Sequence, residues 1–160
     1  MTETAIIEGT ALTWRRRMTD LFNEGDHAFV LLEDVEMRDV ADPRQVVHAP
    51  HAQVNLEAVL IAIGDSAVAY APEFHVRKGA ERAYISIPPY TVVGHVHLHS
   101  GEGLRDGLDM LVGRVIPVTD AVYWSRSLGI HRTSAAMLAV NHARAQILLP
   151  FDEGSPDGPA

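Results

Sequence analysis

Apolar and polar residues alternate most regularly along Gly94-His95-Val96-His97-Leu98-His99. In an extended strand, alternate side chains share one face. The pattern therefore predicts a strand over Tyr90–His99, in which Val96 and Leu98 face a core. The three histidines would form a row on the opposite face.

The spacing changes after this strand from two residues to three and four. Leu104, Leu108 and Leu111 lie on one face of a predicted short helix, which Ser100 can cap and Gly113 can end. We expect an apolar strand over Val115–Trp124 next. The unit closes with strands around Val140-Asn141 that run into Gln146–Leu149.

The first part of the chain shows the same order of elements. It predicts a strand over Ala5–Thr13, a helix with the stripe Met18, Leu21 and Phe22, a strand over His27–Met37, and strands around Val54-Asn55 that run into Ala58–Ile63. A shift of 86 residues pairs Asp34 with Asp120 and Asn55 with Asn141, with no gap between about 6–63 and 92–149. Repeated order predicts a repeated architecture, so we interpret the chain as an internal repeat.

The stretch between the two units reads as a hairpin with Gly79 in its turn, after which Pro88-Pro89 would interrupt pairing. One such unit buries little surface alone, so two would pack together. We expect an α+β, β-rich chain of two similar small barrel-like or sandwich-like lobes, each with one short helix. The first repeat lobe is predicted over 5–63 and the second over 92–149. A hairpin connection over 64–91 joins them, and a disordered acidic tail covers 150–160.

Composition narrows the function classes. The net charge of -8 disfavours general nucleic-acid binding, because a negative field repels phosphate. The absence of cysteine excludes disulfides and thiolate chemistry within the chain. The N-terminus does not read as a signal peptide, and the longest apolar run, Ala58–Ile63, is too short to span a bilayer. We expect a cytoplasmic protein that does not bind membranes.

Four segments of the second unit resemble a small uncharacterised bacterial domain family. They are Pro88–His97, the helix Leu104–Leu108, the strand Ile116–Ala121 and the closing Leu138–Asn141. The resemblance covers about 60 residues well, and the first unit fits it more loosely. It implies two divergent tandem copies of a domain without an assigned activity.

The histidine row is the main candidate for chemistry. Alternate histidines on a strand can place two nitrogens on one metal ion, with a third ligand from elsewhere. The predicted metal set is His95, His97, His99 and Glu102, and His131 and His142 are further candidates. The spacing from His95 to Glu102 matches the first metal motif of cupin barrels, but Pro89 and Asp109 stand where that motif has glycines. The alternative is the polar outer face of a half-buried strand.

The repeated polar residues also have two interpretations. A carboxylate beside an amide, as in Asp34 with Asn55 or Asp120 with Asn141, could serve an enzyme. The same residue types close turns by bonding their own backbone, and we favour that structural role.

The sequence therefore predicts a non-enzymatic interaction or regulatory module without a catalytic set or cofactor. Its strand edges favour a homo-oligomer or another protein partner. The alternative is a metal-dependent small-molecule enzyme or sensor that uses the histidine row with a divalent metal. A third hypothesis, ligand binding between the lobes, has no particular residues to support it.

Overall fold

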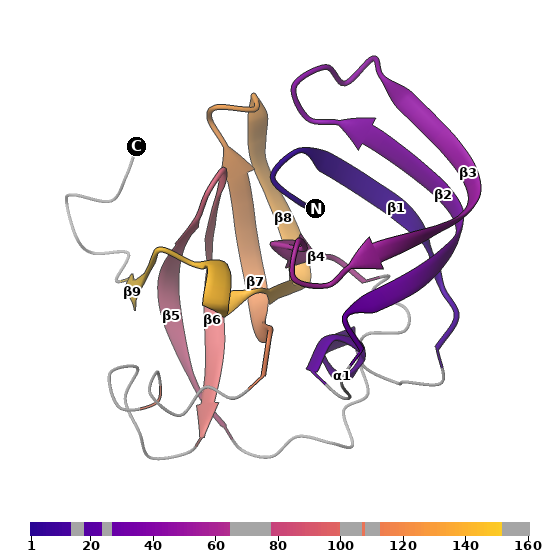
Figure 1. Ribbon diagram of the computed structural model, residues 1–160. Coiled ribbons are helices and arrows are strands. Elements are labelled where there is room, and N and C mark those ends of the chain that lie inside the picture. The colour runs from indigo at the N-terminus through magenta and orange to yellow at the C-terminus, as the bar shows by residue number, and fades with distance from the viewer. Residues whose placement is uncertain (14–17, 24–26, 65–77, 100–106, 108–112, 152–160) are drawn as a thin grey trace.

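Two antiparallel sheets and one short α-helix make up the computed structural model in the residues that it describes, which are 1–13, 18–23, 27–64, 78–99, 107 and 113–151 (Figure 1). None of the helices among these residues is long and apolar enough to cross a membrane. The prediction of a β-rich chain is confirmed. Neither sheet closes into a barrel.

The first sheet has three strands in the order β1-β2-β3, which are Ala5–Ala11, Phe29–Asp39 and Val46–Asn55. The helix α1, Met18–Asn23, follows β1 and buries Phe22. Strand β3 forms one edge of this sheet, with β2 as its hydrogen-bonded neighbour.

The second sheet has six strands in the order β4-β8-β7-β6-β5-β9. The strands are Ile61–Ala62, Lys78–Ile87, Tyr90–His99, Ile116–Ser125, Ile130–Val140 and Ile147–Pro150, numbered β4 to β9 along the chain. A 3-10 turn, His142–Arg144, precedes β9. We call residues 1–64 the first half and residues 78–151 the second half. Strand β4 therefore carries the first half into the sheet of the second half.

Two apolar clusters lie on either side of the β4–β8 pair. Ile61 and Val140 belong to the larger cluster, which is built mainly from the second half. Their neighbours Ala62 and Ala139 pack in the smaller cluster, together with Phe22 and other residues of the first half. Because alternate residues of a strand face opposite ways, this short pair contributes to both cores.

The connection between the halves differs from its prediction. Gly79 lies within β5 opposite Leu98 and forms no turn. Pro88 and Pro89, joined by a cis peptide bond, form the turn between β5 and β6, whose first pair is Ile87 with Tyr90. Proline lacks an N–H but suits a tight turn, so it connects the two strands here. The predicted second helix, except Gly107, and the tail from 152 onward lie outside the described residues.

Both sheets contain a bulge at matching places. The β1–β2 register shifts between Glu8 and Thr10, and the β6–β7 register shifts between Val93 and His95. Asp34 and Asp120, in the bulged strands, have φ values of 50° and 48°. Aspartate tolerates this left-handed region better than most residues, so the two aspartates have a structural role within strands rather than in turns.

Candidate functional site

The histidine row lies on β6 as the alternation predicted, as far as its side chains are described. Val96 is fully buried, whereas His95 and His97 are half-buried on the other face. Both histidines meet β7: His95 Nδ1 lies 3.6 Å from Asp120 Oδ2, and His97 Nε2 lies 2.7 Å from Thr119 Oγ1. The side chains of Leu98 and His99, and the whole of Glu102, lie outside the described residues.

The structure does not bring a metal-binding set together in the part of the chain that it describes. There, no group of three or more His, Cys, Asp or Glu side chains is arranged to hold a metal ion. His142 instead bonds through Nε2 to the carbonyl oxygen of Gly113 at 2.8 Å. His131 lies exposed on β8. The full predicted set, which includes Glu102 and the His99 side chain, remains a hypothesis.

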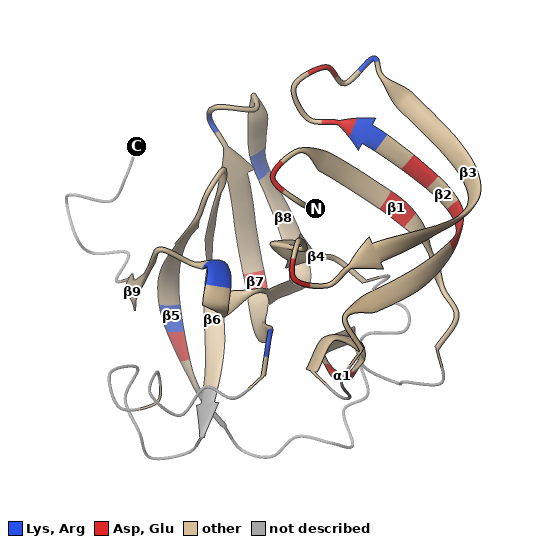
Figure 2. Ribbon diagram, in the orientation of Figure 1, with Lys and Arg blue, Asp and Glu red and all other residues tan. Residues whose placement is uncertain are grey.

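Several acidic residues lie on β1 and β2 of the three-stranded sheet (Figure 2). Glu36 accepts a 2.6 Å hydrogen bond from Arg38 Nε, and its other carboxylate oxygen lies 3.7 Å from His48 Nδ1. Glu8 lies 3.5 Å from the Arg38 guanidinium. The hydrogen bond and charge of Glu36, with a smaller effect of Glu8, raise the pKa of Arg38 above its usual value. Glu8, Arg38 and Glu36 form an exposed ion-pair network across β1 and β2, a type that contributes little to stability.

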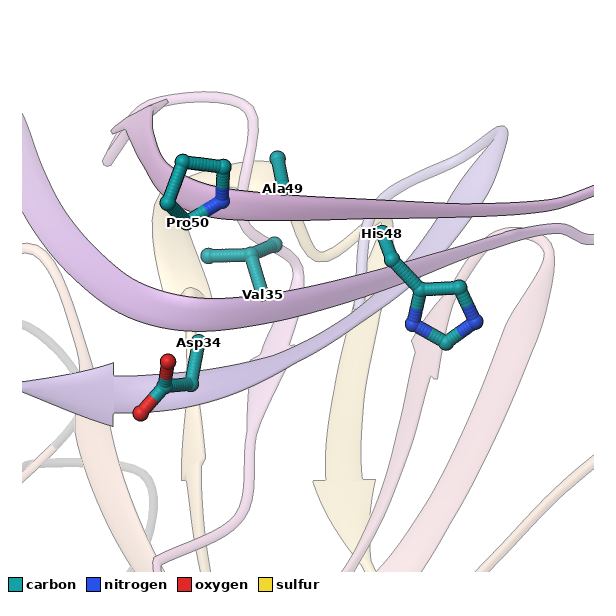
Figure 3. Close-up of a pocket in the computed structure, with 5 residues that line it drawn as sticks. All are labelled: Asp34, Val35, His48, Ala49 and Pro50. Atoms are coloured by element: carbon teal, nitrogen blue, oxygen red, sulfur yellow. The ribbon is translucent and has the colours of Figure 1, made fainter.

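A shallow pocket of about 450 Å³ opens beside this network on β2 and β3. Its lining residues are Asp34, Val35, His48, Ala49 and Pro50. Figure 3 shows that the Asp34 carboxylate and the His48 imidazole do not point toward one another. Convergent polar groups are the usual mark of a small-molecule site, and this pocket lacks that arrangement among its lining residues.

Asn141 forms the polar connection between the halves. Its Nδ2 donates to the Val59 carbonyl oxygen at 3.0 Å, and its backbone N–H donates to the Leu60 carbonyl oxygen at 2.9 Å. Asn55 behaves as the sequence predicted and closes a local turn by accepting the Glu57 N–H at 2.9 Å. The prediction of a local turn for Asn141 is wrong, because its side chain reaches across to the first half.

Asn23 supports the same junction from the end of α1. Its amide donates to the Val115 carbonyl oxygen and accepts the Val115 N–H, each at 2.8 Å. Arg144 donates to the Glu57 carbonyl oxygen at 3.1 Å. The halves therefore meet through β4 and β8 and through several side chains that bond to backbone.

The open strand edges are the feature that sequence reasoning did not locate. Within the described residues, β3 has β2 as its single neighbour and β9 has β5 as its single neighbour. The Leu56 N–H donates to the carbonyl oxygen of Ala28, next to the start of β2. Because backbone N–H groups point to alternate sides along an antiparallel strand, the N–H groups of Asn55 and Gln53 face away from β2. Exposed apolar side chains lie nearby, namely Phe29 and Leu31 on β2 and Ile147 and Leu149 on β9. Period-two alternation identifies such strands, but it does not show which of them lies at an edge.

No known family, curated protein or solved structure matches this chain.

Proposed function

We propose that this protein is a non-enzymatic interaction or regulatory module that binds another polypeptide through the open edge of β3. The observation that carries the proposal is the β3 edge, which no other described strand pairs and whose outward amides, at Gln53 and Asn55, lie beside exposed Phe29 and Leu31. Unpaired edges are templates for strand addition, and main-chain hydrogen bonds then provide the affinity. Apolar side chains beside such an edge add buried area to the contact.

We further propose that the two halves are divergent copies of one unit, as the resemblance to a small bacterial domain implies. Supporting features are the two aspartates with positive φ, 86 residues apart, and a bulge opposite Gly9 and another opposite Gly94. Each half also contains an equivalent backbone hydrogen bond. The Leu60 N–H donates to the Met1 carbonyl oxygen, and the Gln146 N–H donates to the Ser86 carbonyl oxygen. These matches relate β1 to β6 by 85 residues and the later strands by 86. An alignment of the two halves therefore needs a one-residue gap after β1, which the sequence comparison does not place.

The test replaces the outward amide of β3. Gln53→Pro removes that N–H and leaves the bonds to β2, because proline is tolerated where the N–H faces away from the sheet. Gln53→Ala is the matched substitution that retains the N–H. The full chain is cross-linked in an extract of its source, and each captured polypeptide is purified and titrated against the three proteins.

We expect at least one polypeptide, the chain itself included, to bind Gln53→Pro at least tenfold more weakly than it binds Gln53→Ala. Equal binding by both variants would contradict the proposal. Turnover of a defined substrate that disappears on substitution of His95 or His97 would replace it with the metal-dependent alternative. That alternative draws its support from His95 beside Asp120.

A further inference from the structure

We propose that a second copy of this chain occupies the open edge of β3, and that its β9 is the added strand. The inference rests on the interaction role proposed above and names the partner. The chain already contains the pairing on which the proposal is based, because β4 of the first half adds to β8 of the second half. The equivalent elements, β9 and β3, both lie at a sheet edge, and each has an open side among the described residues.

The existing pair sets the register of the proposed one. Ile61 lies opposite Val140, and Ala62 lies opposite Ala139. A shift of 86 residues converts these pairs into Ile147 opposite Val54 and Leu148 opposite Gln53. Asn141 bonds to the backbone of Val59 and Leu60, so Asn55 would bond to Ala145 and Gln146 of the next copy.

Positions that are 86 residues apart differ in burial: the residue with a neighbouring strand is buried, and its counterpart at an open edge is exposed. Ile61 is 0% exposed, whereas Ile147 is 51% exposed. Val115 is 2% exposed, whereas Phe29 is 49% exposed. Addition of β9 from a second copy to β3 would bury Ile147 and Phe29. Their counterparts Ile61 and Val115 are already buried where β4 and the rest of the first half contact the second half. Burial of these exposed apolar side chains favours association.

A single chain does not bring the two edges together. Figure 1 shows β9 and β3 on opposite sides of the molecule. The pairing therefore joins separate copies. The pairing uses the β3 edge of one copy and the β9 edge of the next. Such an assembly closes into a ring if the rotation from one copy to the next permits it, and a two-fold dimer is the smallest closed form.

The charges of the halves favour this head-to-tail arrangement. Residues 1–64 carry eleven Asp and Glu against five Arg, whereas residues 78–151 carry five Asp and Glu against seven Lys and Arg. The formal charges are therefore -6 and +2. Contact between the first half of one copy and the second half of the next brings opposite charges together, whereas two first halves would repel.

The assembly is tested by light scattering and sedimentation of the full chain over about 1 μM to 1 mM, a range that covers weak to moderate Kd values. We expect a mass of two or more chains, with dissociation promoted by salt. Gln53→Pro should weaken assembly by at least tenfold more than Gln53→Ala does. Circular dichroism and thermal unfolding of each variant report whether its monomer is folded. A wild-type chain that remains monomeric at about 1 mM would overturn the inference.

The register is tested by cysteine cross-linking, for which the chain offers a cysteine-free background. Asn55→Cys chains are mixed with Gln146→Cys chains, which the proposed register places opposite each other. The control mixes Gln53→Cys with Gln146→Cys, a diagonal pair about 7–8 Å apart and beyond disulfide reach. We expect the first mixture to form mixed disulfide dimers several times faster than the control. Equal rates in both mixtures would overturn the proposed register.

The two proposals fail in different ways. A monomeric wild-type chain that still binds another polypeptide, with loss of binding in Gln53→Pro, overturns self-assembly and leaves the interaction role standing. Self-assembly that Gln53→Pro leaves intact overturns both the edge and the proposed pairing.

Discussion

The side chain of Asn141 donates to the carbonyl oxygen of Val59 at 3.0 Å and so joins the second half of the chain to the first. Both groups come from segments that flank the β4–β8 pair. Asn141 is buried, and its Oδ1 has no hydrogen-bond partner among the described residues. The Nδ2 donor is therefore the side-chain contribution of Asn141 to the junction.

Asn141→Ala should lower the free energy of unfolding by about 2 kcal/mol, because it leaves the buried Val59 carbonyl unpaired. The matched change Asn55→Ala removes an exposed turn bond and should cost about 0.5–1 kcal/mol. Urea unfolding at low protein concentration measures both. Equal losses for the two asparagines would contradict a special role of Asn141 at the junction.

Gly94→Ala should be more destabilising than Gly9→Ala. A Cβ at Gly94 would lie 2.6 Å from Val118 Cγ1 and 2.9 Å from the Thr119 carbonyl oxygen. At Gly9 the nearest atom, the Glu33 carbonyl oxygen, would be 3.0 Å away. We expect about 3 kcal/mol at Gly94 and about 1 kcal/mol at Gly9, because the fully packed second sheet has less room to adjust. Chemical denaturation that ranks the two variants the other way would contradict this account of the bulges.

Asp120 should tolerate glycine better than valine. Its φ of 48° is accessible to glycine without strain, whereas a β-branched residue is strained there. We expect Asp120→Gly to change the free energy of unfolding by less than about 0.5 kcal/mol and Asp120→Val to lower it by about 1–2 kcal/mol. The same pair of substitutions at Asp34 is the internal control, and thermal melts of all four variants provide the comparison.

Tyr90 should make stability depend on pH in the alkaline range. Burial, with a smaller effect of Tyr123, raises the pKa of Tyr90 to about 12, and its hydroxyl donates to the Thr2 carbonyl oxygen at 3.1 Å. Because this acid has a higher pKa when folded, its contribution is full below the unfolded pKa of about 10 and is lost as pH rises toward 12. Tyr90→Phe should remove that part of the pH dependence. Denaturant midpoints between pH 9 and 12 report it, and identical slopes for both proteins would contradict the assignment.

Metal analysis separates the interaction role from the metal-dependent alternative. Stoichiometric metal in the native protein that disappears in the His95→Ala/His97→Ala double variant would favour the enzyme or sensor. The interaction role predicts substoichiometric metal and no rise in the melting temperature with added Zn²⁺, since a ligand that binds the folded state raises that temperature. The variant Thr119→Val, which changes no charge, removes one hydrogen-bond partner of His97 and serves as a control for local disturbance.

Some of the strands were predictable because their information is local, whereas most of β3 and β8 lies where the sequence predicted a connection. Alternation placed β6 and oriented Val96 inward, and apolar runs placed β2 and β7 within two residues of their observed starts and ends. The predicted turn at Gly79 and the predicted break at Pro88-Pro89 are wrong, because either position suits a turn and the choice depends on which strands pair.

The chain by itself indicated several of the extended segments, the side of each that faces a core and the positions where aspartate recurs, since period-two patterning and residue chemistry depend on near neighbours. The tertiary structure alone decided that β4 leaves its own half and pairs with β8, while β3 and β9 remain at edges. Strand pairing joins residues far apart in sequence, and its free energy depends on registers and burial that no local pattern encodes. For the same reason Ile61 is fully buried and Ile147 is half exposed, although the sequence presents them as equivalent.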